Sequence, residues 1–191
     1  ETGSDGRSDR TWIVDPLDGT TNFLRGIPHW AVSIALREAG TLSVGVIHDP
    51  IKSETFAART GAPATLNGQP IRTAPTETMA NALFGTGIPF GGMDHIDDHA
   101  ADIARLMPLC AGVRRMGAAS LDLAYVASGR LDGFWERRLQ PWDIAAGLVI
   151  LDQSGARTEG WHRAENPRDT GTVLTATPAL FDAFARVLRA G

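Results

Sequence analysis

The chain has 191 residues, of which 43% are hydrophobic and 21% are charged, a composition typical of a globular protein with a substantial core. Its net charge of −4 and the lack of a Lys/Arg-rich block argue against a nucleic-acid partner. The single cysteine, Cys110, excludes an internal disulfide and agrees with a reducing compartment. No apolar run is long enough to cross a bilayer, so we expect a cytoplasmic protein without a membrane partner.

The first part of the chain predicts an antiparallel meander of strands. Apolar and polar residues alternate in successive short runs that Gly, Pro and Asp residues interrupt. Asp49-Pro50 and Asn67-Gly68 are turn signals between the later strands. The predicted strands span residues 11–14, 29–38, 41–48, 54–59 and 69–72.

After about residue 80, the pattern changes to strands that alternate with helices. The predicted strands span residues 82–86, 112–116, 131–136 and 172–176, and the predicted helices span 95–106, 120–128, 141–153 and 178–189. We therefore expect an α/β (α+β) fold. Residues 1–80 would form an antiparallel-rich half, residues 81–191 an α/β half, and the two together one structural unit.

The segment Trp12-Ile-Val-Asp-Pro-Leu-Asp-Gly-Thr-Thr-Asn-Phe23 brings two carboxylates to the end of the first predicted strand. Asp15 and Asp18 lie three residues apart across a turn that contains Pro16. Two like charges this close need compensation, which bound cations supply. Carboxylate oxygens favour Mg²⁺, Mn²⁺ or Ca²⁺, and the backbone carbonyl of Leu17 offers a further hard ligand. This motif assigns metal and phosphate binding to the half formed by residues 1–80.

Gly19 and Thr20 follow this pair of carboxylates directly. If a helix begins here, its free N–H groups and positive dipole end face the metal ions and favour a phosphate. Gly19 allows the phosphate to approach the backbone, and the Thr20 hydroxyl is placed to orient a metal-bound water. The alternative is that Asp15 and Asp18 are only turn and cap residues.

A second segment, Gln140-Pro-Trp-Asp-Ile-Ala-Ala-Gly147, places Asp143 in the first turn of an apolar helix. Taken alone, this carboxylate would do no more than complement the helix dipole. A third carboxylate from a distant segment is, however, what a two-metal site needs. Two ions roughly 3.5–4 Å apart can clamp the attacking and leaving oxygens of an in-line displacement.

Together with two further segments, these motifs resemble the inositol monophosphatase family of metal-dependent phosphatases. The further segments are Arg114-Arg-Met-Gly-Ala-Ala-Ser-Leu-Asp-Leu-Ala-Tyr125 and Gly129-Arg-Leu-Asp-Gly-Phe-Trp-Glu136. The match runs in order from about Glu1 to the C-terminus, and four ordered motifs are far more specific than one. The resemblance implies the layered αβαβα sandwich of the sugar phosphatase superfamily. It also implies hydrolysis of a phosphate monoester by in-line attack of a metal-activated water.

The resemblance also assigns roles to individual residues. It implies that Asp15 bridges two Mg²⁺ ions, and that Asp18 and Asp143 hold the second ion near the leaving oxygen. The implied metal ligands for two or three Mg²⁺ ions are Glu1, Asp15, Leu17, Asp18 and Asp143. The implied catalytic residues are Thr20, Asp18 and Asp15. The implied substrate-binding residues are Gly19, Thr20, Arg115, Ala118, Glu136 and Asp143, with Glu136 on the sugar-alcohol hydroxyls.

Two positions leave alternatives open. Family members carry a Gly-Glu-Glu type element and a helical portion upstream of the aspartate motif. Of these, the given sequence contains only Glu1, which is either the ligand glutamate or its neighbour. Arg115 could contact a second anionic group or pair with Glu136, or form an ordinary surface ion pair.

Several other polar residues are expected to be structural. Asp122 lies inside a predicted helix, and Asp132 precedes a glycine at a strand turn. His95 and His99 lie four residues apart, which indicates the exposed face of a surface helix rather than a metal site.

The leading hypothesis is a Mg²⁺-dependent phosphatase of the inositol-1-phosphate type, because Thr21-Asn22-Phe23 resembles the inositol branch. One alternative is a broader sugar or polyol phosphatase that acts on fructose 1,6-bisphosphate or histidinol phosphate. Another is a relative that binds the transcription machinery. The resemblance further implies a homodimer, inhibition by lithium and a small-molecule phosphate monoester as the partner.

Overall fold

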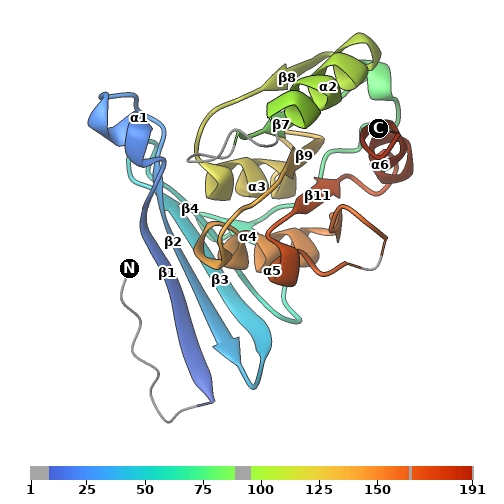
Figure 1. Cartoon of the computed structure of the whole chain (residues 1–191). Helices are drawn as coiled ribbons and strands as arrows, with labels where there is room; N and C mark the ends of the chain where they lie inside the picture. The colour runs from blue at the N-terminus through green and yellow to red at the C-terminus, as the bar shows by residue number, and fades with distance from the viewer. Residues whose placement is uncertain (1–8, 89–95, 164, 191) are drawn as a thin grey trace.

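The computed structural model describes residues 9–88, 96–163 and 165–190. A six-stranded antiparallel sheet with the order β1-β2-β3-β4-β5-β6 forms the first part of the fold (Figure 1). Its strands are β1 (Arg10–Asp18), β2 (Ala31–Glu38), β3 (Thr41–Asp49), β4 (Glu54–Arg59), β5 (Thr65–Leu66) and β6 (Gln69–Pro70). The predicted antiparallel meander is therefore confirmed, with shifts at the strand ends and with β5 as a strand that the sequence did not predict.

Strand β1 continues past the point where the sequence predicts its end. The strand runs through Pro16 to Asp18, and its register with β2 shifts between Asp15 and Asp18. β1 is the edge strand of its sheet, so a proline without an N–H group is tolerated there. The prediction that the strand ends at Asp15-Pro16 is wrong, and the irregularity instead redirects Asp18 relative to Asp15.

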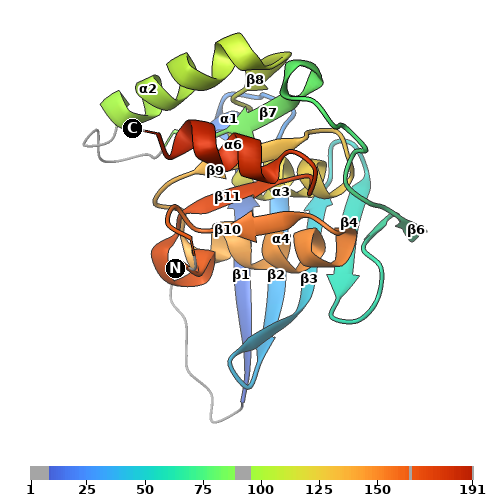
Figure 2. The ribbon, with the colours of Figure 1, turned by 90° about the vertical axis from the view of Figure 1, so that its right-hand side faces the viewer.

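The second sheet has five strands in the order β10-β11-β9-β7-β8 (Figure 2). They are β7 (Leu83–Thr86), β8 (Gly112–Arg114), β9 (Gly133–Glu136), β10 (Arg157–Glu159) and β11 (Val173–Ala176). β7 pairs in parallel with β8 and β9, whereas β9, β11 and β10 pair in antiparallel fashion. Strand β10 was not predicted, because its three residues are polar and only half-buried.

Helices form two further layers around this second sheet (Figures 1 and 2). α3 (Ala119–Ala127) and α4 (Pro141–Ser154) lie between the two sheets, and α2 (Ile96–Leu106) and α6 (Phe181–Leu188) cover the far side of the second sheet. The short helices are α1 (Thr20–Leu24) and α5 (Pro167–Thr170), and 3₁₀ turns span Met79–Asn81 and Met107–Leu109.

This order of layers confirms the expected layered α/β architecture. The first helical layer of the predicted αβαβα order does not occur within the described ranges. There, Trp12 and Val14 are 64% and 46% exposed, so the face of β1 that carries them is open. In the part of the chain that the structure describes, no helix combines the length and apolar character needed to cross a membrane.

The central helices are largely buried because a sheet lies on each side of them. Every residue of α3 is buried, and α4 presents Ile144, Ile150 and Leu151 to the same core. A second core fills the space between the second sheet and its outer helices. In that core, Phe84 and Phe184 stack with their ring centroids 4.5 Å apart. The first core holds α3 and α4 in fixed positions, and these helices carry part of the site described below.

Helix α2 corrects one expectation from the sequence. His99 is only 4% exposed, and its ring stacks on Trp135 with 6.0 Å between the ring centroids. The prediction of an exposed position is wrong for His99, because α2 turns this side toward the second sheet. His95, the other histidine of the pair, lies outside the described residues.

Candidate active site

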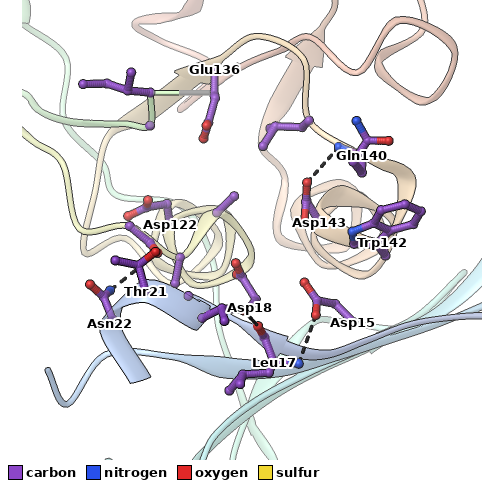
Figure 3. A pocket seen from close by; sticks show the side chains of 18 of the residues that line it. Asp15, Leu17, Asp18, Thr21, Asn22, Asp122, Glu136, Gln140, Trp142 and Asp143 are labelled. Atoms are coloured by element: carbon purple, nitrogen blue, oxygen red, sulfur yellow. Dashed lines mark hydrogen bonds between the residues drawn. The ribbon is translucent and has the colours of Figure 1, made fainter. Parts of the chain in front are cut away.

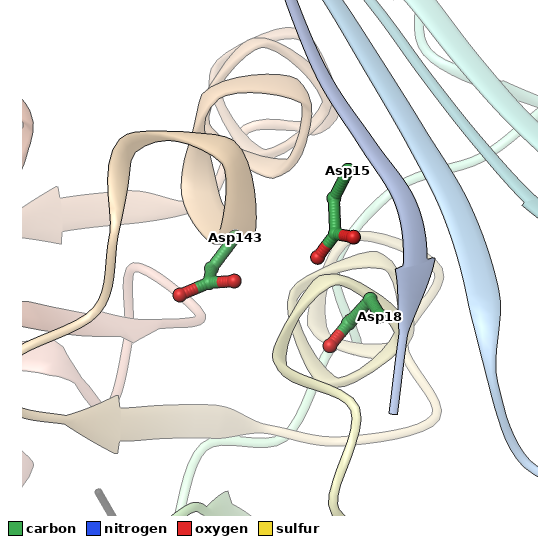
Figure 4. A group of neighbouring side chains, drawn as sticks. All are labelled: Asp15, Asp18 and Asp143. Atoms are coloured by element: carbon green, nitrogen blue, oxygen red, sulfur yellow. The ribbon is translucent and has the colours of Figure 1, made fainter. Parts of the chain in front are cut away.

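Three carboxylates from two distant segments meet between the first sheet and α4 (Figure 4). Asp15 and Asp18 come from the end of β1, and Asp143 comes from the first turn of α4. One oxygen of each carboxylate lies within 4.8 Å of the others. Such a set of hard oxygen ligands suits a divalent cation such as Mg²⁺, Mn²⁺ or Ca²⁺.

The chain between the two β1 carboxylates is held by local hydrogen bonds. The Leu17 N–H donates to Asp15 Oδ1 over 3.0 Å, and the Thr20 hydroxyl donates to the Leu17 carbonyl oxygen over 2.8 Å. These bonds fix the carbonyl that the sequence predicts as a metal ligand next to the carboxylate of Asp15. Asp15 thus lies within β1 rather than in a turn, although its side chain caps the local backbone, and it is also a member of the carboxylate cluster.

Asp18 is anchored by the N-terminus of α3. The Ser120 backbone N–H donates to Asp18 Oδ2 over 2.8 Å, and the Ser120 hydroxyl donates to the same oxygen over 2.5 Å. Burial raises the pKa of Asp18 to about 6, the two Ser120 bonds oppose this shift, and the negative charges of Asp15 and Asp143 add to it. A bound cation would therefore favour the charged form of the Asp18 carboxylate.

Asp143 caps its helix and also belongs to the carboxylate cluster. Its Oδ2 accepts a 2.7 Å hydrogen bond from the Gln140 N–H, and with the Gln140 side chain this makes a capping box at the start of α4. Pro141 occupies a first-turn position in which its missing N–H costs nothing. The cap fixes the carboxylate, so that its remaining oxygen surface faces Asp15 and Asp18.

The turn after Asp18 is tightly packed against the segment that precedes α3. Gly19 has φ of 85°, and a Cβ there would lie 3.1 Å from the His29 carbonyl oxygen and 3.2 Å from Ala118 Cβ. Asn22 Nδ2 donates to the carbonyl oxygens of His29 and Met116, each over 2.9 Å. Asn22 thereby ties the Gly-Thr-Thr turn to the segment that contains Ala118.

The carboxylate cluster and the turn after Asp18 line one cavity of about 690 Å³ (Figure 3). All the predicted site residues of the described chain line it: Asp15, Leu17, Asp18, Gly19, Thr20, Arg115, Ala118, Glu136 and Asp143. Glu1, the remaining predicted ligand, lies outside the described residues. The segments quoted for the family resemblance therefore converge on a single space.

Glu136 forms part of the cavity wall at the end of β9. Its side chain is 7% exposed, and burial raises its pKa to about 8, with further upward shifts from Asp143 and Asp18 and a downward one from Arg115. Gly87 packs directly on it, since a Cβ at that position would lie 2.0 Å from Glu136 Oε2. Glycine is therefore required opposite this carboxylate.

Comparison with known proteins identifies the family of the chain. A family model described as the inositol monophosphatase family matches residues 1–190. The chain belongs to the inositol monophosphatase family. Membership makes it an inositol monophosphatase-like phosphatase. The three carboxylates form a cluster that could hold a metal ion.

Named relatives of the family agree with this assignment. The inositol-1-monophosphatase of Rhizobium meliloti is 41% identical over 187 residues, which cover 98% of this chain and 70% of that protein. Nus factor SuhB of Pseudomonas aeruginosa is 40% identical over 189 residues, with coverages of 98% and 70%. The crystal structure of SuhB from Bartonella henselae matches with a TM-score of 0.92 at 37% identity, covering 95% of this chain and 70% of that one. The inositol monophosphatase of Anabaena matches with a TM-score of 0.91 at 38% identity, with coverages of 96% and 74%.

Several residues of the site in this family member were not singled out in the sequence. They are Ser120, Asn22, Gly87, Arg138 and Gln140. A polar residue three positions before a carboxylate at the start of a helix resembles a capping box and could have identified Gln140. The bond between Ser120 and Asp18, by contrast, joins positions 102 residues apart. Asp122, expected to be structural, is fully buried in the cavity wall, and its Oδ1 has no hydrogen-bond partner. Burial, Glu136 and Asp18 raise the pKa of Asp122 well above its usual range.

The raised pKa of Glu136 predicts how stability depends on pH. The folded, metal-free chain binds this proton more tightly than the unfolded chain, whose glutamate titrates near 4.5. Stability from that proton is complete below the unfolded pKa and is lost as the pH rises to about 8. For the parent chain in EDTA, we expect the free energy of unfolding in urea to fall by on the order of a few kcal/mol between pH 6 and pH 9. Glu136→Gln should remove this fall. If the free energy of unfolding of Glu136→Gln depends on pH as strongly as that of the parent chain, Glu136 is not the source of the pH dependence.

Proposed function

We propose that this chain is a Mg²⁺-dependent phosphate monoester hydrolase of the inositol-1-monophosphatase type. One observation carries the proposal: the carboxylates of Asp15, Asp18 and Asp143 converge in the cavity whose wall also contains Gly19, Thr20 and Glu136. A metal site, a phosphate-binding turn and a hydroxyl acceptor thus share one space. Family membership and the relative named inositol-1-monophosphatase support the same activity.

The residues present suit divalent cations, and we propose that they hold two or three Mg²⁺ ions. The donor set consists of three carboxylates and the Leu17 carbonyl, all hard oxygens, and the mutual repulsion of Asp15, Asp18 and Asp143 calls for positive charge between them. Asp15 would bridge two ions, and Asp18 and Asp143 would hold the second. When bound, the ions supply Lewis-acid polarisation of the phosphoryl oxygens and a water of lowered pKa.

The Thr20 side chain supports a role in orienting the attacking water. Its hydroxyl proton is donated to the Leu17 carbonyl oxygen, so the lone pairs of Oγ1 can accept a hydrogen bond from a water. Gly19 and Thr20 would donate backbone N–H groups to the phosphate, because the first N–H groups of a helix have no partner within it. These N–H groups and the Thr20 hydroxyl would together hold the phosphorus in line with the attacking water.

The opposite wall would bind the alcohol portion of the substrate. Glu136 would accept hydrogen bonds from its hydroxyl groups, since ionised carboxylates only accept, and bound cations would favour the ionised form. Ala118 and Asp143 would lie along the same portion, and Arg115 lies close enough to Glu136 to lower its pKa. Hydrogen bonds to Glu136 alone would discriminate only modestly, so a range of sugar and polyol phosphates is compatible with the site.

The direct test is phosphate release from inositol 1-phosphate with increasing Mg²⁺. We expect turnover to appear with Mg²⁺, to disappear in EDTA and to return when Mg²⁺ is restored, because the carboxylate cluster alone cannot activate water. Zn²⁺ or Ca²⁺ at equal concentration serves as the comparison. No release from inositol 1-phosphate, fructose 1,6-bisphosphate or histidinol phosphate at saturating Mg²⁺ would refute the proposal.

A second candidate function rests on the relatives named Nus factor SuhB. Their 40% identity supports a role in binding the transcription machinery, separately or alongside hydrolysis. The discriminating experiment is co-purification with RNA polymerase using the parent chain and Asp15→Asn. Capture that survives the substitution supports the binding role, whereas failure of both proteins to capture the polymerase argues against it.

A further inference from the structure

Asp122 is a buried residue of the cavity wall to which the proposed reaction assigns no role. It lies in the first turn of α3 and is 1% exposed, yet it lines the candidate active site. Its Oδ1 has no hydrogen-bond partner in the part of the chain that the structure describes. Buried carboxyl groups are nearly always hydrogen-bonded, because an unpartnered one loses its interactions with water and gains none in return.

The other buried acidic side chains show what is missing at Asp122. Most of them accept hydrogen bonds from a backbone N–H, a hydroxyl or a cationic side chain, namely Asp18, Asp49, Asp102 and Asp132. Glu136 resembles Asp122 instead, since no group within the described ranges donates a hydrogen bond to its carboxyl group. The two buried carboxyl groups without a donor there thus line the same cavity.

Asp122 and Glu136 come from different elements but lie against the same segment of the second sheet. A Cβ at Gly85 in β7 would lie 3.6 Å from Asp122 Oδ1. One at Gly87, directly after β7, would lie 2.0 Å from Glu136 Oε2. Residues two apart in an extended chain are separated by about 7 Å, so one polyol can reach both carboxyl groups. In Figure 3, the Glu136 side chain points from β9 toward α3, the helix that carries Asp122.

The electrostatics of this pair suit a hydroxyl group better than an anion. Burial raises the pKa of Asp122 well above its usual range, and among the nearby charges Glu136 adds most to this shift. A carboxyl group that keeps its proton can donate one hydrogen bond and accept others, whereas an ionised one only accepts. A hydroxyl group both donates and accepts, so it can bind to either form.

We propose that Asp122 is a substrate-binding residue, which together with Glu136 forms hydrogen bonds to two hydroxyl groups on the alcohol portion of a phosphate monoester. The inference rests on the proposed phosphatase function and adds to it a residue that the sequence pattern suggests to be structural. The first turn of α3 would then serve both ends of the substrate. Ser120 fixes Asp18 at the carboxylate cluster, and Asp122 binds the alcohol.

Inositol 1-phosphate and cyclohexyl phosphate test the proposal, because they share a six-membered ring and differ in the hydroxyl groups on it. We expect Asp122→Ala to lower kcat/KM for inositol 1-phosphate by about tenfold, the effect of one or two lost hydrogen bonds. For cyclohexyl phosphate, kcat/KM should stay within about twofold of the parent value, since this ester offers Asp122 no hydroxyl group. A residue that only supports the fold would lower both values together.

A conservative variant and a matched control complete the experiment. Asp122→Asn keeps an oxygen acceptor and an N–H donor in the same shape, so its preference for inositol 1-phosphate should stay within about threefold of the parent value. Asp152→Ala removes an exposed carboxylate outside the cavity and should behave like the parent chain. The melting temperature of Asp122→Ala in EDTA should not fall below that of the parent, because the change removes a buried carboxyl group without a partner.

A preference in Asp122→Ala within about twofold of the parent value would show that water, rather than substrate, satisfies Asp122, and would overturn the proposal. Equal losses for both esters would assign Asp122 a structural role and overturn it as well. Lack of turnover of both esters by the parent chain at saturating Mg²⁺ would instead defeat the phosphatase function. Dissociation constants of the two esters, measured by calorimetry with Mg²⁺, would then decide the role of Asp122. Equal ratios of these constants in the parent and in Asp122→Ala, or no binding of either ester, would overturn it.

Discussion

Asp143→Asn is expected to reduce Mg²⁺-dependent phosphate release by at least about 100-fold. Loss of a residue that only supports a metal ligand costs up to about 100-fold, and Asp143 is proposed to be a ligand itself. Asp143 supplies one of three carboxylates whose oxygens lie within 4.8 Å of one another. An amide oxygen is a weaker ligand and carries no charge. The loss should be larger at low Mg²⁺ than at saturating Mg²⁺, because the substitution acts first on metal affinity.

The fold should tolerate this substitution. The asparagine keeps an oxygen that can accept the Gln140 N–H, and the change removes one of three like charges that repel one another in the metal-free chain. The unfolding free energy in EDTA should therefore equal or exceed the parent value. Loss of activity without loss of stability would show that the carboxylate serves the site rather than the helix cap.

Asp152→Asn provides the matched control on the same helix. Asp152 is an exposed residue near the end of α4, where its Oδ2 accepts from the Gln153 side chain. This change alters the net charge of the chain by the same amount, far from the carboxylate cluster, and we expect parent-like turnover and Mg²⁺ dependence. Parent-like turnover by Asp143→Asn across the Mg²⁺ range would remove Asp143 from the proposed metal ligands.

The carboxylate cluster could be predicted because the types and spacing of its residues carry chemical information. Asp15 and Asp18 lie in one short segment, so their proximity needs no tertiary structure. Asp143 could be added only through the family resemblance, since nothing in the composition of α4 says which strand its first turn will meet. The capping box then shows that a local role and a role in the site coexist in the same side chain.

Other features depend on packing that a linear pattern does not encode. The bond from Ser120 to Asp18 forms only because the N-terminus of α3 meets the end of β1. His99 follows two aspartates in a polar run, yet tertiary packing places its ring on Trp135. Pro16 indicates a strand end, but an edge position lets β1 continue past it. In each case the position of the residue in the folded chain, rather than its local sequence, determines the outcome.

Gly45→Ala is expected to destabilise the fold by about 3 kcal/mol, because it overfills the contact between the first sheet and α4. In the strand register, Gly45 lies between Ala35 and Ala58, so a row of small residues crosses the sheet. A Cβ at Gly45 would lie 2.4 Å from the Ala146 carbonyl oxygen, a backbone atom that can move only with its helix. The melting temperature should fall by about 6–12 °C in thermal unfolding.

Gly40→Ala in the same hairpin separates steric overlap from backbone strain. Gly40 has φ of 82° and open space around it, so its substitution costs only the left-handed conformation, about 1 kcal/mol. We expect parent-like Mg²⁺ affinity for this control. Equal stability of Gly40→Ala and Gly45→Ala would show that α4 does not depend on a close approach at Gly45.

The same overlap should also reach the metal site. Ala146 lies three residues after Asp143 on α4, so a helix pushed away from β3 carries the Asp143 carboxylate away from Asp15 and Asp18. Because metal ligation tolerates little displacement, Mg²⁺ affinity measured by calorimetry in the folded Gly45→Ala protein should fall by about tenfold or more. Unchanged affinity would mean that the first turn of α4 is held by its cap alone. The expected loss would show that the distance between the sheet and the helix, set by a missing side chain at Gly45, determines the geometry of the three carboxylates.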